Sequence, residues 1–200
     1  MLQNIYTILQ KRYNVSRETF NRLREYYLIL SKWNVKINLV AKSTIEQFWQ
    51  RHIFDSIQLL NYIDDKSIIL TDLGSGAGFP GMVLSIVGIK KVILIESNAR
   101  KAAFLLHASQ LSNNKVEIIN DRVESLKIKC DIITVRAFAN LTKILSYTSQ
   151  FSIRNKYLIL KGKTVQQEIK QALLYKNFIY QLYPSCVEDS SWVLEIKVKE

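Results

Sequence analysis

The chain has 200 residues, with 28 Lys or Arg against 17 Asp or Glu, and its formal charge at pH 7 is +11. Two cysteines and two histidines without metal-ligand spacing exclude a disulfide framework and a metal cluster, and the short apolar runs exclude a transmembrane segment. The N-terminal stretch lacks the layout of a signal peptide, so we expect a cytoplasmic protein without membrane contact. The positive charge favours a polyanionic partner such as nucleic acid, although a lysine-rich composition with solvated faces would give the same excess.

The first sixty residues are expected to be helical. Ser16 is suited to cap a helix that ends near Asn34. Apolar side chains recur within it at the three- to four-residue spacing of a buried helix face, at Phe20, Leu23, Tyr27 and Leu30.

A second helix is predicted from a capping box. Ser43 and Glu46 have the spacing at which a serine hydroxyl and a glutamate carboxylate bond reciprocally to backbone N–H groups. The helix is expected to run to about Leu60, with its buried face formed by Ile45, Trp49, Ile53, Ile57 and Leu60. We therefore expect residues 1–62 to form a helical extension packed on a core of residues 63–200.

A glycine-rich turn follows the first predicted strand. The run at 68–70 is apolar, as in a buried strand, and Asp72 closes it with a carboxylate. Glycines follow at 74, 76, 78 and 81, and Pro80 suits the first turn of a helix because its ring presets φ. A strand, a glycine turn and a helix open a nucleotide-type α/β fold, in which backbone without Cβ atoms lets a ligand approach.

Two ligand classes fit this turn. The segment 76–81 matches the Gly-x-Gly-x-x-Gly pattern of dinucleotide binding, and Glu96 lies at the offset expected for gripping a ribose. Read from Asp72, the same segment is Asp-x-Gly-x-Gly-x-Gly, which is similar to the first motif of class I methyltransferases that use S-adenosylmethionine. Pro80 removes one N–H donor that a pyrophosphate would use, which favours the methyl donor. Glu96 suits the ribose of either ligand, because an ionised carboxylate accepts from two hydroxyls; a surface carboxylate at a strand end is the alternative.

The rest of the chain alternates strands and helices. Strands are predicted at 91–96, 116–119, 130–135, 156–160, 177–183 and 192–199, and helices at 98–112, 140–149 and 164–175. Ser97 is expected to cap the first of these helices. The order β-α-β-α-β-α-β after Ser67, with a hairpin-like pair at the end, predicts a seven-stranded, mostly parallel, Rossmann-like sheet.

Several segments together resemble one family. They are Asn38-Leu39, Arg51-His52-Ile-Phe-Asp55-Ser56, Asp72 to Gly81, Arg122-Val-Glu124, Arg136-Ala-Phe-Ala139 and Lys161-Gly162. In this order they resemble the bacterial RsmG family, once called glucose-inhibited division protein B, over roughly residues 34–162. The resemblance implies a class I methyltransferase that uses S-adenosylmethionine to modify guanine N7 in 16S ribosomal RNA. It implies the 16S rRNA or the small ribosomal subunit as partner, and we expect a monomer that needs no metal.

The resemblance also implies the site residues. The cofactor would be held by Asp72, Gly74, Gly76, Gly78, Phe79, Glu96, Val123, Glu124 and Arg136. The candidate contacts to phosphate or guanine are Arg51, Arg122, Arg136, Lys161 and Lys163. Core packing is the alternative role for Val123, a surface ion pair is the alternative for Arg136, and a structural role for His52 is as open as a catalytic one.

The chemistry of guanine N7 agrees with these residues. N7 carries an unprotonated lone pair, so positioning suffices and no general base is expected. The chain has no Asp/Asn-Pro-Pro-aromatic motif of the kind that accompanies exocyclic amine methylation, and neither Cys130 nor Cys186 lies where a cytosine C5 enzyme has its nucleophile. Methylation of another RNA, an NAD-dependent oxidoreductase using the same loop, and a non-catalytic RNA-binding module stay open.

Overall fold

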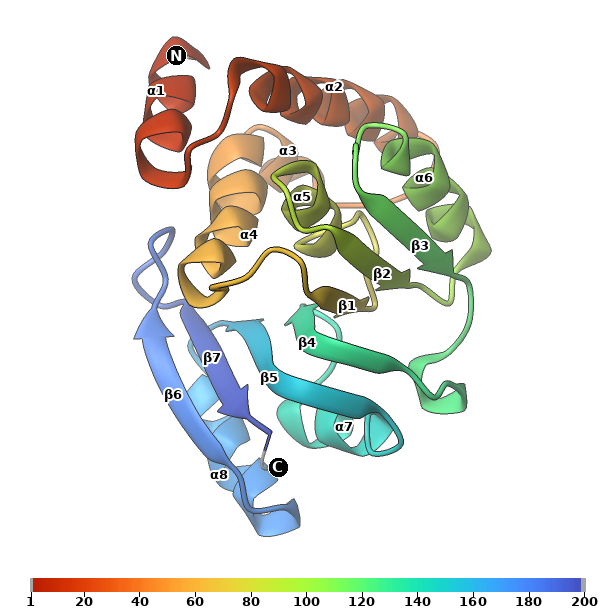
Figure 1. Ribbon diagram of the computed structural model, residues 1–200, viewed down its shortest axis with the longest axis vertical. Coiled ribbons are helices and arrows are strands. Elements are labelled where there is room, and N and C mark those ends of the chain that lie inside the picture. The colour runs from red at the N-terminus through yellow and green to blue at the C-terminus, as the bar shows by residue number, and fades with distance from the viewer. Residues whose placement is uncertain (1, 199–200) are drawn as a thin grey trace.

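A single seven-stranded sheet organises the molecule, with helices on both of its faces (Figure 1). The computed structural model describes residues 2–198. The strands are β1 (Ile69–Leu73), β2 (Lys91–Ile95), β3 (Lys115–Ile119), β4 (Lys129–Arg136), β5 (Ser152–Lys161), β6 (Ile179–Pro184) and β7 (Trp192–Lys197). They lie in the order β3-β2-β1-β4-β5-β7-β6, and β7 runs antiparallel to both of its neighbours while the other pairs are parallel. The predicted sheet is confirmed; the predicted extension of its last strand to Lys199 lies outside the described residues.

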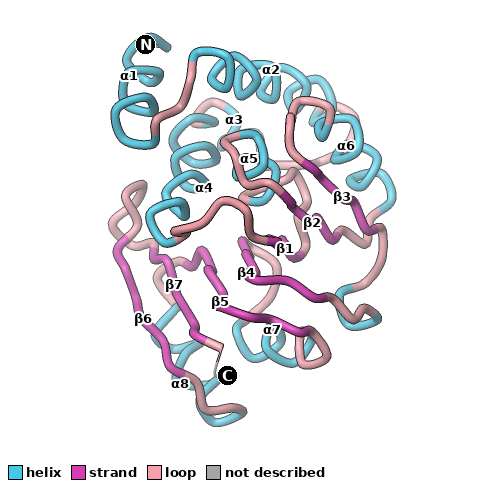
Figure 2. Tube along the Cα trace, viewed as in Figure 1, coloured by secondary structure: helices cyan, strands magenta, loops and turns pink. Residues whose placement is uncertain are grey.

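Helices precede the sheet and connect most of its strands (Figure 2). They are α1 (Leu2–Tyr13), α2 (Arg17–Asn34), α3 (Lys42–Ile45), α4 (Asp55–Ile57), α5 (Gly81–Ile86), α6 (Ala99–Ser109), α7 (Leu141–Tyr147) and α8 (Val165–Tyr175). A π-helical segment spans Trp49–Phe54, and short 3-10 segments span Gln58–Tyr62 and Val123–Ser125. Within residues 2–198, no helix has the length and apolar character needed to cross a membrane.

Alternation along the strands separates two hydrophobic cores. Side chains of successive strand residues point to opposite faces of a sheet. Leu70, Val92 and Ile132 therefore belong to a core shared with α1, α2, α5 and α6, whereas Ile133 and Val135 belong to a core under α7 and α8. The first core includes Leu9, Leu23, Leu30 and Ile53 from the N-terminal helices together with residues of the sheet.

The predicted N-terminal helix is confirmed at its start. The Ser16 hydroxyl accepts a hydrogen bond from the Thr19 N–H at 3.1 Å, and α2 begins at the next residue. Phe20, Leu23 and Leu30 are buried, and Tyr27 is half-buried. Tyr26 is also fully buried, although the predicted face did not include it.

The predicted capping box and continuous helix at Ser43–Leu60 are wrong. Ala41 occupies the N-cap position of α3 without a side-chain bond, and the chain then passes through the π-helical segment, α4 and a 3-10 turn. The cause lies outside the segment: Arg136 donates to the Arg51 carbonyl at 2.8 Å, while the Asp55 N–H bonds to the His52 carbonyl. Ile53 and Ile57 are buried as predicted, whereas Ile45, Trp49 and Leu60 are half-buried and Phe48 takes the buried place beside them.

Two smaller predictions are also corrected. Asn98, not Ser97, caps α6, because its side-chain oxygen accepts from the N–H groups of Arg100 and Lys101. The helix expected between the third and fourth strands is only the 3-10 turn Val123–Ser125, since the connection from Ile119 to Lys129 is short. The other predicted helices are present, with Pro80 immediately before the first residue of α5.

Candidate functional site

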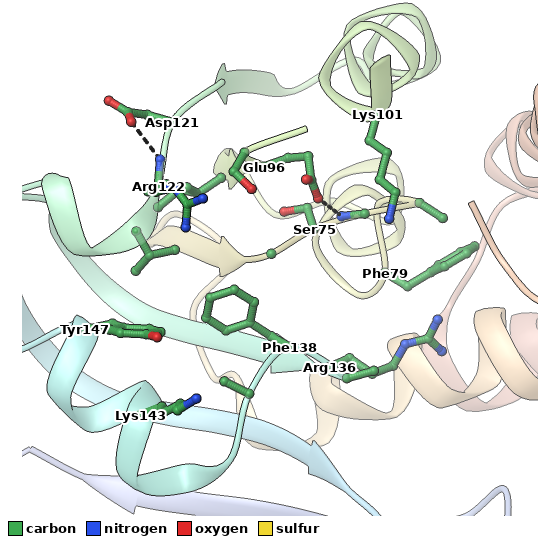
Figure 3. A pocket seen from close by; sticks show the side chains of 18 of the residues that line it. Ser75, Phe79, Glu96, Lys101, Asp121, Arg122, Arg136, Phe138, Lys143 and Tyr147 are labelled. Carbon is green, nitrogen blue, oxygen red and sulfur yellow. Dashed lines mark hydrogen bonds between the residues drawn. The ribbon is translucent and has the colours of Figure 1, made fainter. Parts of the chain in front are cut away.

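A cavity of about 540 Å³ opens beyond the carboxyl ends of β1, β2 and β4 (Figure 3). The chain passes from β3 at one side of the sheet to β4 on the other side of β1, so the strand order reverses here. Ligands of open α/β sheets bind at such a reversal. Of the predicted site residues, those that line this first cavity are Gly74, Gly76, Phe79, Glu96, Arg122, Val123, Glu124 and Arg136.

The glycine turn shapes the floor of the first cavity. Gly74 and Gly76 have φ of +61° and +54°, where a side chain is strained. A Cβ atom on Gly74 would also overlap the ring of Phe138, whereas one on Gly76 would meet only the Gly74 carbonyl, at 3.7 Å. Gly78 lies outside the lining and packs against Tyr26, whose hydroxyl donates to the Ala77 carbonyl. Tyr26 of α2 therefore supports the turn on the side of the core, and the ring of Phe138 packs against Gly74 on the side of the cavity.

Glu96 is fixed at the end of β2 by the same turn. Its Oε2 accepts from the Gly76 N–H and its Oε1 from the Asn98 N–H, both at 2.8 Å. The residue is 7% exposed and lines the first cavity. Ionised carboxylate oxygens have more than one acceptor site each, so Glu96 keeps capacity for donors inside the cavity.

Asp72 lies beneath the turn and does not line the first cavity. Its Oδ1 accepts from the Thr134 hydroxyl at 2.8 Å, and its Oδ2 has no partner among the described residues. Burial raises the pKa of Asp72 from 3.8 to about 6, against the lowering effect of the Thr134 hydroxyl. Its predicted contact with the cofactor stays a prediction.

Phe79, His52 and Arg136 form a stacked group at one side of the first cavity. The rings of His52 and Phe79 are stacked, with centroids 4.5 Å apart and planes 11° apart. The guanidinium carbon of Arg136 lies 4.9 Å from the Phe79 centroid, within cation–π range. The glycine turn, the helical extension and the end of β4 therefore meet at these three side chains.

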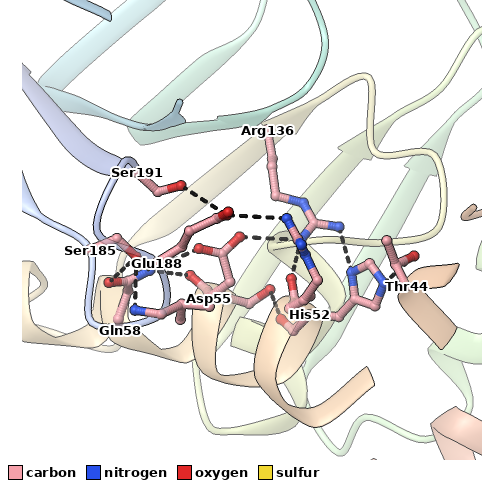
Figure 4. A network of polar contacts seen from close by, with 11 residues as sticks. Thr44, His52, Asp55, Gln58, Arg136, Ser185, Glu188 and Ser191 are labelled. Carbon is pink, nitrogen blue, oxygen red and sulfur yellow. Dashed lines mark hydrogen bonds and ion pairs between the residues drawn. The ribbon is translucent and has the colours of Figure 1, made fainter. Parts of the chain in front are cut away.

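Arg136 is held by three acceptors from the helical extension (Figure 4). Its Nη1 donates to the Arg51 carbonyl and to Asp55 Oδ2, at 2.8 and 3.2 Å, and its Nη2 lies 2.9 Å from His52 Nδ1. Burial raises the pKa of Asp55, and the neighbouring Arg136 opposes this shift. The alternative of a surface ion pair does not describe Arg136, because its side chain is only 18% exposed and faces both the first cavity and a neighbouring one.

His52 is a neutral residue in this arrangement. Burial, together with the charges of Arg136 and Arg51, lowers its pKa from 6.5 to about 3. Its Nε2 contacts the Thr44 hydroxyl at 3.1 Å. His52 therefore lies between Arg136 and the Thr44 hydroxyl, in hydrogen-bond contact with both.

The second cavity, of about 620 Å³, adjoins the first. The two share the segment from Arg136 to Asn140 as a wall. The second continues past Arg51 and Asp55 to Glu188 in the β6–β7 loop and to Trp192 at the start of β7. Phe138 thus lines both cavities. No local sequence pattern marks the second cavity, because the elements around it are distant in the chain.

The predicted RNA contacts differ in their surroundings. Arg122 is 77% exposed and 3.7 Å from Glu124, and Arg51 pairs with Glu188 at 3.1 Å. Lys161 is only 11% exposed, with its ammonium bonded to the Ala139 carbonyl and to Glu168, whereas Lys163 is exposed. Each of these contacts to RNA stays a prediction, and Lys163 is freer than Lys161 to make one.

Some lining residues were missed from the sequence. Lys101 on α6, and Lys143 and Tyr147 on α7, line the first cavity (Figure 3). Phe138 belongs to the Arg-Ala-Phe segment that carries the family resemblance. An aromatic residue two positions after the end of a parallel strand is the one signal that could have marked it.

Neither cysteine lines the first or the second cavity. Cys130 is buried, and burial raises its pKa to about 11, while Cys186 is exposed in the β6–β7 loop. Within residues 2–198, no three His, Cys, Asp or Glu side chains are grouped so as to hold a metal ion.

Solved structures share this fold. Magnesium protoporphyrin IX methyltransferase from Synechocystis PCC 6803, determined with bound SAM, matches with a TM-score of 0.62 at 15% identity, covering 98% of this chain and 97% of that one. The ribosomal protein L11 methylase of Lactobacillus delbrueckii matches with a TM-score of 0.61 at 14% identity, covering 72% of this chain and 77% of that one. These likenesses establish the class I methyltransferase fold.

Sequence relatives are much more similar. The ribosomal RNA small subunit methyltransferase G of Orientia tsutsugamushi (strain Ikeda) is 68% identical over 99% of this chain and its own full length. The protein of the same name from Rickettsia prowazekii (strain Madrid E) is 49% identical over 91% of this chain and 95% of its own. The family model GidB, described as rRNA small subunit methyltransferase G, matches residues 19–189. The chain therefore belongs to the GidB family of small-subunit rRNA methyltransferases.

Proposed function

We propose that the protein transfers a methyl group from S-adenosylmethionine to N7 of a guanine in 16S ribosomal RNA. The observation that carries the proposal is the pairing of two cavities across one wall: the first holds the glycine turn and Glu96, and the second is open beside Arg136 and Phe138. One cavity is thus available for the methyl donor and its neighbour for a target base.

The residues of the first cavity fit S-adenosylmethionine. Its volume of about 540 Å³ is in the usual range for a ligand of this size. The space above Gly74 and Gly76 exists because neither has a Cβ atom, and Glu96 presents a carboxylate to ribose hydroxyls. Val123 and Glu124 would flank the adenine, and Asp72, Gly78, Phe79 and Arg136 would support the cofactor from the turn and from the end of β4.

The bound cofactor supplies an electrophilic methyl group on a sulfonium. The guanine N7 lone pair attacks without prior deprotonation, so no side chain has to act as a base. The task of the chain is to orient the base and exclude water. Phe79, Phe138 and the half-buried guanidinium of Arg136 are suited to this. Phe79 packs on His52 and Arg136, Phe138 packs on Tyr147, and Arg136 makes three polar contacts.

The charge of the chain supports an RNA partner. Its formal +11 favours a polyanion. The exposed Arg122 lines the first cavity, and the exposed Lys163 follows Gly162, which lines the second. We further propose a monomeric cytoplasmic enzyme acting on the 16S rRNA or the small ribosomal subunit, organised as an extension, 1–62, and a core, 63–200. Membership of the GidB family does not favour the dinucleotide alternative.

The test is methyl transfer from labelled S-adenosylmethionine to small ribosomal subunits, and to free 16S rRNA, from a strain that lacks the protein. We expect label in 7-methylguanine of the 16S rRNA. Label in another base, or in another RNA, would reject the substrate while keeping the methyltransferase. Comparing subunits with free rRNA identifies which of the two is the substrate.

A further inference from the structure

The second cavity is lined by three carboxylates, and in two of them both oxygens already accept hydrogen bonds from the protein. Asp55 accepts from Arg136 with one oxygen and from Gln58 with the other. Glu168 accepts from the Leu141 N–H and Lys161 with Oε2, and from Thr164 with Oε1. Each carboxylate oxygen of Asp55 and Glu168 thus accepts a hydrogen bond from the protein, so both residues have a structural role.

Glu188 is the third carboxylate, and it is differently placed. Its Oε2 accepts from Arg51 at 3.1 Å and from the Ser191 hydroxyl at 3.4 Å. None of residues 2–198 donates to its Oε1, and its side chain is 49% exposed. The carboxylate is thus oriented by two donors while one oxygen stays available in the second cavity.

The β6–β7 loop that carries Glu188 is anchored to the helical extension (Figure 4). Gln58 accepts from the Cys186 N–H at 3.0 Å and donates to the Ser185 hydroxyl at 3.1 Å. Gln58 itself is 2% exposed and also donates to Asp55, the partner of Arg136. Gln58 and Asp55 therefore link the loop that carries Glu188 to Arg136.

Guanine is recognised by the donors on its Watson–Crick edge. N1–H and the N2 amino group are adjacent donors, whereas N7 lies on a different edge of the purine. A carboxylate accepts from both donors, and it has no hydrogen to offer adenine N1. When the N7 of a guanine in the second cavity faces the first cavity, its N1–H and N2–H point in a different direction. An acceptor for these two donors must therefore lie in the second cavity, away from the first cavity.

We propose that Glu188 is the residue that selects guanine, accepting hydrogen bonds from N1–H and N2–H of the target base. This assignment rests on the proposed function, because it requires that the base in the second cavity be the methyl acceptor. Arg51 then acts as the partner that fixes and neutralises the carboxylate. A paired contact of this kind discriminates between bases by about 10- to 100-fold.

The test compares wild type with Glu188→Ala on small-subunit RNA that carries either guanine or inosine at the methylated position. Inosine keeps N7 and N1–H but lacks the N2 amino group. We expect wild type to favour guanine about 10-fold or more in kcat/KM, and Glu188→Ala to methylate both substrates at similarly low rates. Glu188→Gln keeps one acceptor oxygen and should keep part of the preference.

Asp189→Ala is the matched control. It removes the same charge from the adjacent position, which is exposed and lines neither cavity, and it should preserve the guanine preference. Cofactor affinity and melting temperature report on folding, since Glu188 does not line the first cavity. If wild type and Glu188→Ala prefer guanine equally, Glu188 does not select the base, and the proposed function still stands. If wild type transfers no methyl group to guanine, both the proposed function and the role of Glu188 are overturned.

Discussion

Arg136 Nη2 lies 2.9 Å from His52 Nδ1, and this contact fixes the state of the histidine. A guanidinium has no acceptor, so Nδ1 must be the unprotonated nitrogen. The hydrogen is then on Nε2, from which it reaches the Thr44 hydroxyl at 3.1 Å. A neutral imidazole thus joins the helical extension to the end of β4.

The first prediction is that acid destabilises the protein through His52. Its folded pKa, about 3, is below the value of 6.5 expected for the unfolded chain. The unfolded state therefore binds a proton first, and the stabilisation present above pH 6.5 is lost as pH falls from 6.5 towards 3. Since one pKa unit is about 1.4 kcal/mol, the contribution of His52 falls by several kcal/mol by pH 4, while the raised pKa of Asp72 acts in the opposite direction over the same range.

Urea unfolding between pH 7 and 4 isolates the His52 contribution as the difference between wild type and His52→Gln, in which an amide oxygen still accepts from Arg136 and Asp72 is unchanged. The variant should lose less stability over that range. Imidazole resonances of His52 and of the exposed His107 are distinguishable, since the chain has two histidines. Protonation of His52 near pH 6.5 in the folded protein would refute the assigned neutral state.

The second prediction concerns the several N–H donors of the Arg136 guanidinium. Arg136→Lys keeps the charge but cannot satisfy the Arg51 carbonyl, Asp55 and His52 together. We expect kcat/KM for methyl transfer to fall by about 100-fold, because misplacement of positioning groups has effects of that size. Arg154→Lys, at an exposed pair with Asp131, is the control and should be fully active. Wild-type rates in Arg136→Lys would remove its proposed role.

The third prediction separates Gly74 from Gly76. Both have φ near +60°, so alanine at either position is strained by roughly 1–2 kcal/mol. Only Gly74→Ala also displaces Phe138 from the wall between the cavities. Calorimetric titration with S-adenosylmethionine should show at least a tenfold greater loss of affinity for Gly74→Ala than for Gly76→Ala. Equal losses would mean that backbone strain alone matters.

The fourth prediction distinguishes two neighbouring lysines. Lys161→Met leaves Glu168 and the Ala139 carbonyl without their donor and should lower the free energy of unfolding by about 1–3 kcal/mol. Lys163→Ala should change it by less than about 0.5 kcal/mol, because the side chain is exposed. If Lys163 contacts phosphate, its variant weakens RNA binding and lowers the salt dependence of that binding. Unchanged RNA affinity would remove Lys163 from the interface.

Local signals predicted the fold well. The Ser16 cap depends on residues three positions apart, and the glycine turn on residues 72–81, so both are written in short stretches of chain. The buried strands are recognisable for the same reason, because their apolar runs differ from the amphipathic helices. The closing antiparallel pair followed from the order of elements.

The features that could not be predicted from the sequence depend on contacts between residues that are far apart in the chain. The helix predicted from Ser43 is interrupted because Arg136, 85 positions from Arg51 in the chain, takes a backbone carbonyl. The pair of Arg51 and Glu188 spans 137 positions, so no local pattern marks Glu188 as part of the site. Asp72 belonged to the predicted motif, but only the structure places it beneath the turn, away from the lining of the first cavity.

The fifth prediction is that Asp72→Asn stabilises the protein without ligand. The pKa of Asp72 in the folded chain, about 6, is above its value of 3.8 in the unfolded chain. The folded state therefore holds the proton longer, and stability falls as pH rises from 3.8 to 6, by roughly 3 kcal/mol in all. Asparagine removes this cost, so its melting temperature should exceed that of wild type at pH 7.5, with a much smaller difference at pH 4.

The same substitution tests whether the buried charge serves the cofactor. At pH 7.5 the ionised Asp72 has an oxygen, Oδ2, without a partner among the described residues, and such a group costs free energy unless a ligand compensates for it. S-adenosylmethionine carries positive charge on its sulfonium and its ammonium, so its binding should be weaker in Asp72→Asn than in wild type. A stabilised variant with reduced affinity would mean that stability is sacrificed for binding at this position. A stabilised variant with unchanged affinity would make Asp72 a residue of the turn alone and would remove it from the cofactor site.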